Sequence, residues 1–248
     1  MAKQSGAKKV VPALIGLILA IGAAAVVQHL RVGSDPDDVS LGATTLGRAL
    51  SEDQTAAWAA TTLANLPVIS RADLAEAKNH PYDRAAFPHW EEATVGGWGA
   101  QYTGCTARQA TMIRDGQGVV VEPEDCWVAK GAWTDPYTGD VSTQYGAVSV
   151  DHVVPLAAAW KAGAWQWSEA QRTKFANDPD ELAAVGYDVN QDKGAKGPDE
   201  WLPDNPDAWC AYAVRWIAVK DEYALPLLNE DERTALERAL DTCAADGA

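Results

Sequence analysis

The stretch that decides the fold is Ala147-Val148-Ser149-Val150-Asp151-His152-Val153-Val154-Pro155. Its β-branched valines and closing proline predict a strand over residues 147–154. A second apolar run, residues 182–185, is bounded by Asp180 and Gly186 and suits a partner strand. Residues 188–193 are polar and lack breakers, so we expect a short helix that Gly194 ends. The predicted order is therefore strand, excursion, strand, helix.

This order could gather an acid, an imidazole and an amide around one divalent cation. Asp151 would supply an anionic oxygen and Asn190 a neutral one, and Mg²⁺ or Mn²⁺ prefers such ligands. His152 would point to the opposite side of the strand and could deprotonate a water. Lys193 follows Asn190 by three residues on the same helical face and could meet a phosphate.

These residues and their neighbours resemble the secreted bacterial HNH endonuclease family proteins, whose domain is similar to the nuclease part of the GmrSD restriction enzymes. The resemblance covers roughly residues 61–243. The matching residues around the central motif are Asp151 to Leu156, Trp160, Phe175 to Asp178, Leu182, Val185, Asn190, Lys193-Gly194 and Glu200 to Pro203. Further matches are Tyr82, Arg84, Phe87, Trp90, Cys105, Arg108, Cys126, Asp135 to Gly139, Cys210 to Tyr212, Trp216, Val219-Lys220 and Cys243.

The resemblance implies a ββα-metal fold around one catalytic divalent cation. By this similarity Asp151 and Asn190 bind the metal, and His152 is the general base. Glu181 stands where family members tend to carry an asparagine that orients the base through its side-chain oxygen. A glutamate carboxylate could still do so, and Asn177 is the other candidate for this role.

Two arginines carry a second implication of the resemblance. The similarity favours a position near the substrate phosphate for Arg108, and the alternative is a solvated surface arginine. The same two interpretations hold for Arg84. His80 and His89 have no carboxylate at metal-ligand spacing, so we interpret both as ordinary surface or turn histidines.

The N-terminal 32 residues are predicted to be a signal peptide or a signal anchor. Lys3, Lys8 and Lys9 form a basic head before an uncharged apolar run over residues 10–27. Residues 33–60 are interpreted as a linker and helical extension, and residues 61–245 as the nuclease domain. This organisation predicts a protein that is secreted or anchored to the outer face of the cytoplasmic membrane, and touches the membrane only through its N-terminal segment.

Four cysteines suit such an extracytoplasmic domain, at positions 105, 126, 210 and 243. Three connectivities are possible. We predict Cys105–Cys126 and Cys210–Cys243, because each bridge closes a modest loop. The predicted class is α+β: a ββα-metal core with additional helices, two disulfides and a small β-hairpin region. That hairpin is expected from residues 111–113 and 118–121, around the Asp115-Gly116 turn.

A net charge of -15 bears on the substrate, because proteins that hold a nucleic-acid backbone usually carry basic patches. We therefore expect a monomeric, Mg²⁺- or Mn²⁺-dependent endonuclease that hydrolyses DNA with low sequence specificity. Its capture of the DNA substrate should be weak and sensitive to salt. The alternative is a non-catalytic, disulfide-stabilised surface binding module. A metallopeptidase is disfavoured, because the sequence lacks a His-Glu-x-x-His motif.

Overall fold

The computed structural model describes residues 52–122 and 125–243. The predicted N-terminal signal or anchor segment and most of the predicted linker lie outside these residues. Within the described ranges, no helix is both long and apolar enough to cross a membrane.

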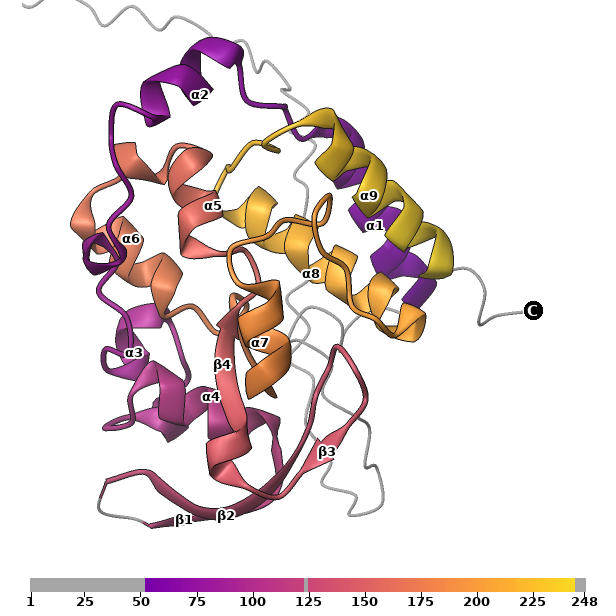
Figure 1. Ribbon diagram of the computed structural model, residues 1–248. Coiled ribbons are helices and arrows are strands. Elements are labelled where there is room, and N and C mark those ends of the chain that lie inside the picture. Colours follow the sequence, from indigo (N-terminus) through magenta and orange to yellow (C-terminus); the bar gives the residue numbers. More distant parts are fainter. Residues whose placement is uncertain (1–51, 123–124, 244–248) are drawn as a thin grey trace, which may run out of the picture. The chain divides into compact units, whose positions relative to one another are not determined.

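A two-stranded antiparallel hairpin and the helix after it stand between the other elements (Figure 1). Strand β4 (Val148–His152) pairs with β5 (Leu182–Gly186), and α7 (Tyr187–Lys193) follows β5 directly. Asp151 lies opposite Ala183, and His152 opposite Leu182. The predicted order of strand, excursion, strand and helix is confirmed. Strand β4 ends at His152, two residues before the predicted end, where the chain turns towards Pro155.

Both faces of the hairpin are buried, each in its own hydrophobic cluster. Ala183 and Val185 belong to the larger cluster, with residues of the C-terminal helices. Val148, Val150, Leu182 and Ala184 belong to the second cluster, with residues of helix α4 and the three-stranded sheet. Because neighbouring strand residues point to opposite faces, Asp151 and His152 point to different sides of the hairpin.

The excursion between the two strands is helical. It contains α5 (Leu156–Lys161) and α6 (Glu169–Ala176). Ser168 and Gln171 form a capping box at the start of α6, in which each side chain bonds the other residue's backbone N–H.

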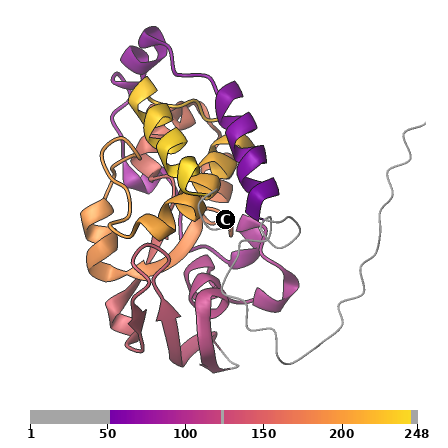
Figure 2. The ribbon, with the colours of Figure 1, turned by 90° about the vertical axis from the view of Figure 1, so that its right-hand side faces the viewer.

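The C-terminal half of the chain packs against an N-terminal helix. In Figures 1 and 2, α1 (Glu52–Asn65) lies beside α8 (Trp209–Glu222) and α9 (Glu230–Leu240). Ala59 and Leu63 of α1 are buried in the same cluster as Trp216 of α8. Helix α1 thus continues across the predicted boundary at residue 60 and contributes to the core.

The predicted hairpin at residues 111–121 is wrong, because residues 107–115 form helix α4 (Ala107–Asp115). Thr106 and Gln109 make a capping box that starts this helix, a signal that the Asp115-Gly116 turn pattern obscured. The hairpin lies further along: β1 (Gly116–Glu122) pairs with β2 (Trp127–Thr134), and β2 pairs with β3 (Val141–Ser142). The shorter described elements are α2 (Arg71–Ala77), η1 (Arg84–Ala86), α3 (Ala93–Gly96), η2 (Ala100–Tyr102), η3 (Tyr145–Ala147), η4 (Ala164–Gln166) and η5 (Pro206–Ala208).

Both predicted disulfides are present, Cys105–Cys126 and Cys210–Cys243. The first bridge joins Cys105, just before α4, to Cys126, just before β2. The second joins Cys210 of α8 to Cys243, which follows α9. Each bridge stabilises the fold chiefly by restricting the unfolded chain, by about 2–4 kcal/mol. The observed class is α+β with two disulfides.

Candidate active site

Asp151 is a buried carboxylate with a partner on each oxygen. Its Oδ1 accepts a hydrogen bond from the Lys193 ammonium at 2.9 Å, and its Oδ2 accepts one from the Tyr137 hydroxyl at 2.8 Å. Burial and the neighbouring Asp151 charge raise the pKa of Tyr137 well above its usual value, so the phenol remains a donor. The carboxylate of Asp151 is therefore held in one orientation.

Lys193 comes from the last turn of α7 and is 0% exposed. Its ammonium also donates to the backbone carbonyl of His152 at 2.9 Å. The structure thus directs this side chain towards β4, where it holds the Asp151-His152 dipeptide. The expected contact with a phosphate would require the ammonium to leave these two acceptors.

Asn190 lies one helical turn before Lys193 and also faces β4. Its Nδ2 donates to the Ser149 hydroxyl at 2.7 Å and to the Val150 carbonyl at 3.4 Å. This leaves the amide oxygen for other contacts. The shared helical face of Asn190 and Lys193, inferred from their spacing, agrees with these contacts.

His152 lies on the other face of the hairpin and is 6% exposed. Its Nε2 is 3.0 Å from the carbonyl oxygen of Ala176. Because a carbonyl can only accept, Nε2 carries the proton and Nδ1 keeps the lone pair. Burial lowers the pKa of His152 to about 3, and the charges of Arg84 and His89 contribute to the same shift. The imidazole is therefore neutral near pH 7 and free to accept a proton, although a pKa this low makes it a weaker base than an exposed histidine.

Two aromatic residues adjoin His152. The ring centroid of Trp90 lies 5.5 Å from that of His152, and the ring centroid of His89 lies 6.3 Å away. Trp90 has a φ of 64°, an unusual backbone conformation for a bulky residue. The sequence predicts an ordinary surface or turn histidine at position 89. Its position beside the candidate base depends on the tertiary fold and has no local sequence signal.

Asn177 fixes the segment that supplies the carbonyl partner of His152. Its side-chain oxygen accepts from the backbone N–H of Glu91 at 2.9 Å. Its amide nitrogen donates to the carbonyls of Pro88 at 2.9 Å and Thr173 at 2.7 Å. Asn177 directly follows Ala176, so these bonds position the carbonyl that fixes the imidazole.

Glu181 is completely buried beside the same dipeptide. Its Oε2 accepts from the backbone N–H of Val154 at 3.1 Å, and its Oε1 has no hydrogen-bond partner among the described residues. Burial raises the pKa of this carboxyl well above its usual value. Within the described ranges, Glu181 makes no hydrogen bond with the His152 ring, so its side chain contacts the turn after β4.

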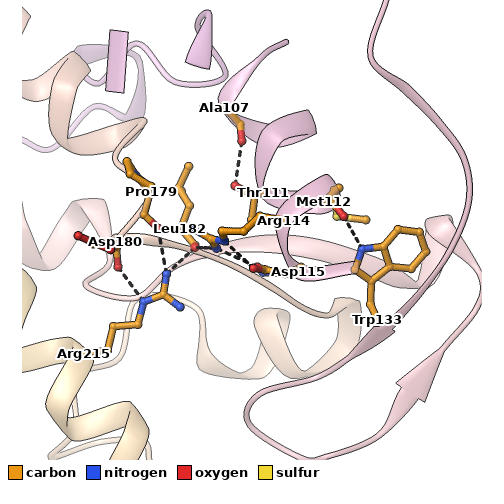
Figure 3. Close-up of polar contacts among 11 residues, drawn as sticks. Ala107, Thr111, Met112, Arg114, Asp115, Trp133, Pro179, Asp180, Leu182 and Arg215 are labelled. Carbon is orange, nitrogen blue, oxygen red and sulfur yellow. Dashed lines mark hydrogen bonds and ion pairs between the residues drawn. The ribbon is translucent and has the colours of Figure 1, made fainter. Parts of the chain in front are cut away.

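Two arginines hold the segment around Glu181 from opposite sides (Figure 3). Arg114 of α4 donates to the carbonyls of Pro179 and Leu182, both at 2.5 Å. Arg215 of α8 donates to the same two carbonyls, at 3.1 and 2.6 Å. The start of β5 is thereby fixed between the two helices.

Replacing Glu181 with glutamine is expected to stabilise the protein increasingly as the pH rises past the pKa of an unfolded glutamate, about 4.3. The native carboxyl keeps its proton where the unfolded one has lost it, so Glu181 costs stability as the pH rises past its unfolded pKa. Glutamine keeps an oxygen for the Val154 N–H and does not ionise. Thermal unfolding of Glu181→Gln and wild type between pH 4 and pH 8 measures this. A difference in melting temperature between Glu181→Gln and wild type that does not grow with pH would contradict the raised pKa of Glu181.

Arg108 does not join these residues. Within the described part of the chain it makes no hydrogen bond or ion pair with Asp151, His152, Asn190 or Lys193. Its guanidinium instead lies 5.9 Å from the ring centroid of Tyr145, just before β4.

The donor set suits a hard divalent cation that keeps part of its hydration shell. Asp151 offers a carboxylate and Asn190 an amide oxygen, and each Asp151 oxygen has used only one of its lone pairs. The contacts from Lys193 and Tyr137 resemble the outer contacts that usually orient metal-binding carboxylates. Among the described residues, no group of three or more His, Cys, Asp or Glu side chains is placed to hold a metal. Water and substrate oxygens would have to complete the coordination.

The fold and this site define a mixed α+β protein with an Asp-His dipeptide on a central hairpin, and comparison with known proteins gives its family. Residues 107–234 match the family model described as "GmrSD restriction endonucleases, C-terminal domain". The chain therefore belongs to this family. It is also 42% identical, over 164 residues, to an "Uncharacterized secreted protein" of Arthroderma benhamiae. The matched part covers 65% of this chain and 76% of that protein.

The fungal relative corrects one expectation, since the similarity is not confined to bacterial proteins. No solved structure matches the chain.

Proposed function

We propose that the protein is an extracytoplasmic, divalent-metal-dependent endonuclease of the HNH type that hydrolyses DNA with low sequence specificity. The observation that carries this proposal is the geometry of the Asp151-His152 dipeptide. Asp151 is oriented by Lys193 of α7 and by Tyr137 of the turn after β2, and His152 is a neutral imidazole with its Nε2–H fixed by Ala176. Membership in a restriction-endonuclease family supports a nuclease-related chemistry.

The imidazole of His152 serves as the general base in this proposal. Its Nδ1 lone pair takes a proton from a water, and the resulting hydroxide attacks the phosphorus. The bond to the 3′ oxygen breaks, which leaves a 5′ phosphate on the other product. A cation held by Asp151 and Asn190 would stabilise the extra negative charge on the phosphate.

The remaining polar residues act as positioning residues. Lys193 bridges the Asp151 carboxylate and the His152 carbonyl, so it fixes the backbone on which both functional side chains stand. Asn177 acts one step further away, through the carbonyl of Ala176. Glu181 supports the turn after β4 rather than the imidazole itself.

An extracytoplasmic location agrees with the chemistry of the fold. Two disulfides persist in oxidising compartments and are rare in reducing ones. The fungal relative carries the word "secreted" in its name. Both observations support export of this chain.

Plasmid nicking tests the proposal. The purified protein is expected to convert supercoiled plasmid to nicked and linear forms with Mg²⁺ or Mn²⁺, and to be inactive with EDTA. Asp151→Ala should remove this activity. Asp192→Asn is the control, since Asp192 is an exposed carboxylate on α7, the helix that carries Asn190 and Lys193. Failure of folded, metal-supplied protein to cleave duplex DNA, single-stranded DNA or RNA would refute the nuclease.

A non-catalytic binding module is the second candidate. The net charge of -15 favours it, as does the pairing of both Asp151 oxygens. In that case Asp151 and Lys193 are a buried structural pair, and Asp151→Ala lowers stability without any activity to lose.

A further inference from the structure

A group of aromatic and cationic side chains lies outside the candidate active site, where β2 begins. Trp127 is 51% exposed, and its ring centroid lies 5.8 Å from that of Tyr145, with 37° between the ring planes. The Arg108 guanidinium lies over the ring of Tyr145, 5.9 Å from the ring centroid. We call Arg108, Trp127, Lys130 and Tyr145 the Trp127 surface.

Trp127 differs from the tryptophans that build the core. Six tryptophans donate their indole N–H to an acceptor elsewhere in the fold, which marks them as structural: Trp98, Trp133, Trp160, Trp201, Trp209 and Trp216. In the described part of the chain, the indole N–H of Trp127 has no such acceptor, and Trp127 is the only tryptophan among the exposed large hydrophobic residues. Its exposure has no structural explanation in the fold.

The cations of this surface are free of carboxylate partners. Among the described residues, neither Arg108 nor Lys130 forms an ion pair within 4.0 Å, although the chain is strongly acidic. Lys130 pairs with Val120 across the β1–β2 hairpin, and both are exposed. A guanidinium over one of two neighbouring aromatic rings, with a second unpaired cation on the adjoining strand, suits an anionic polymer that carries flat, stacking groups.

We propose that the Trp127 surface binds unpaired bases of a single-stranded nucleic acid. This inference rests on the proposed nuclease function and adds a binding site for the substrate strand beyond the cleaved bond. Trp127 and Tyr145 supply rings on which bases stack, which works with any base and fits low sequence specificity. Arg108 and Lys130 meet the neighbouring phosphates.

The chain connects this surface to the candidate active site. Tyr145 begins η3, which leads directly into β4. Val148 and His152 are four strand steps apart, roughly 13 Å at the usual rise per residue. Val148 and Val150 share a face of the hairpin with His152, and they pack in the same cluster that Tyr145 contacts. Helix η3 and strand β4 thus link the Trp127 surface to the residue that carries the candidate base.

The acidic groups nearby limit where the phosphates can lie. Glu122 pairs directly with Trp127 across the hairpin and is exposed. A pocket of about 440 Å³ at the start of α7 is lined by Asp135, Asp140 and Asp188 among other residues, so it disfavours an anion. The phosphates are thus expected on the side of Arg108 and Lys130, and Glu122 weakens binding.

Binding of a fluorescent oligothymidylate by the full chain in EDTA tests the inference without cleavage. Trp127→Ala is expected to weaken binding about tenfold, as is usual for the loss of one stacked base. Tyr145→Leu should act in the same direction, and Glu122→Gln should tighten binding, most at low salt. Trp165→Ala is the matched control, since Trp165 stacks on His80 outside this surface. Equal thermal unfolding of the variants establishes that they are folded.

Wild-type affinity in both Trp127→Ala and Tyr145→Leu overturns the inference, as does the absence of binding by the wild type. Binding of a neutral polysaccharide, lost in Trp127→Ala, with no oligonucleotide binding overturns it in favour of a carbohydrate ligand. Different results would refute the nuclease function and the Trp127 surface. Oligonucleotide binding that depends on Trp127, without cleavage, supports the surface and refutes the nuclease. Cleavage by wild type with unaltered binding in Trp127→Ala refutes the surface alone.

Discussion

Replacing His152 with alanine is expected to lower the rate of plasmid cleavage by about 10²–10⁴-fold, the usual contribution of a general base. The imidazole is neutral because burial lowers its pKa to about 3, and its Nε2–H bond to Ala176 leaves Nδ1 as the basic atom. Asp151 and Asn190 keep their contacts in the variant, because these lie on the other face of the hairpin. Divalent-cation binding, measured by calorimetry, should therefore be unchanged.

His80→Ala is the matched control, since His80 stacks on Trp165 at a centroid distance of 3.9 Å and takes no part in the site. It should cleave at the wild-type rate. Cleavage by His152→Ala at an unchanged rate would remove His152 from the mechanism while leaving the metal ligands as proposed. Loss of both cleavage and cation binding would instead assign His152 to the metal.

The central hairpin and α7 were predictable because their signals are local. Alternating valines before Pro155 predict β4, and the apolar run before Gly186 predicts β5. Helix α4 was missed because two local signals conflict over the same residues. The Thr106 capping box favours a helix, whereas Asp115-Gly116 favours a turn. The helix forms because Ala107, Ala110, Thr111 and Met112 are buried along it.

The identity of the central candidate residues came from sequence, but their contacts did not. Lysine is rarely fully buried, so nothing in the sequence indicates that Lys193 forms a buried ion pair with Asp151. The Tyr137 hydroxyl reaches Asp151 only because the turn after β2 folds back over the hairpin. The sequence does not indicate the contacts of Glu181, for the same reason. Its contact with Val154 and the separate bonds of Asn177 depend on how the excursion returns to β5.

Replacing Glu232 with alanine is expected to lower the free energy of unfolding by about 3–5 kcal/mol, because it leaves a buried charge unpaired. Glu232 is 1% exposed and lies 3.0 Å from the ammonium of Lys220, which is itself 0% exposed. The same carboxylate accepts from the Trp216 indole at 2.8 Å and from the Leu228 backbone N–H at 2.6 Å. Burial already lowers the pKa of Lys220, and the carboxylate opposes that shift. Urea denaturation measures the loss.

The exposed Lys174–Glu222 pair is the matched control, with 3.4 Å between its charged atoms and both side chains at least half exposed. Glu222→Ala should cost at most about 1 kcal/mol, since exposed pairs contribute little. The double variant Lys220→Met with Glu232→Leu should recover most of the loss, because it removes both buried charges together. Equal losses in Glu232→Ala and Glu222→Ala would show that Lys220 finds another partner or sheds its proton. Helices α8 and α9 also pack against α1. A large loss of unfolding free energy in Glu232→Ala, with little loss in Glu222→Ala, would therefore show that the Lys220–Glu232 ion pair stabilises this group of helices.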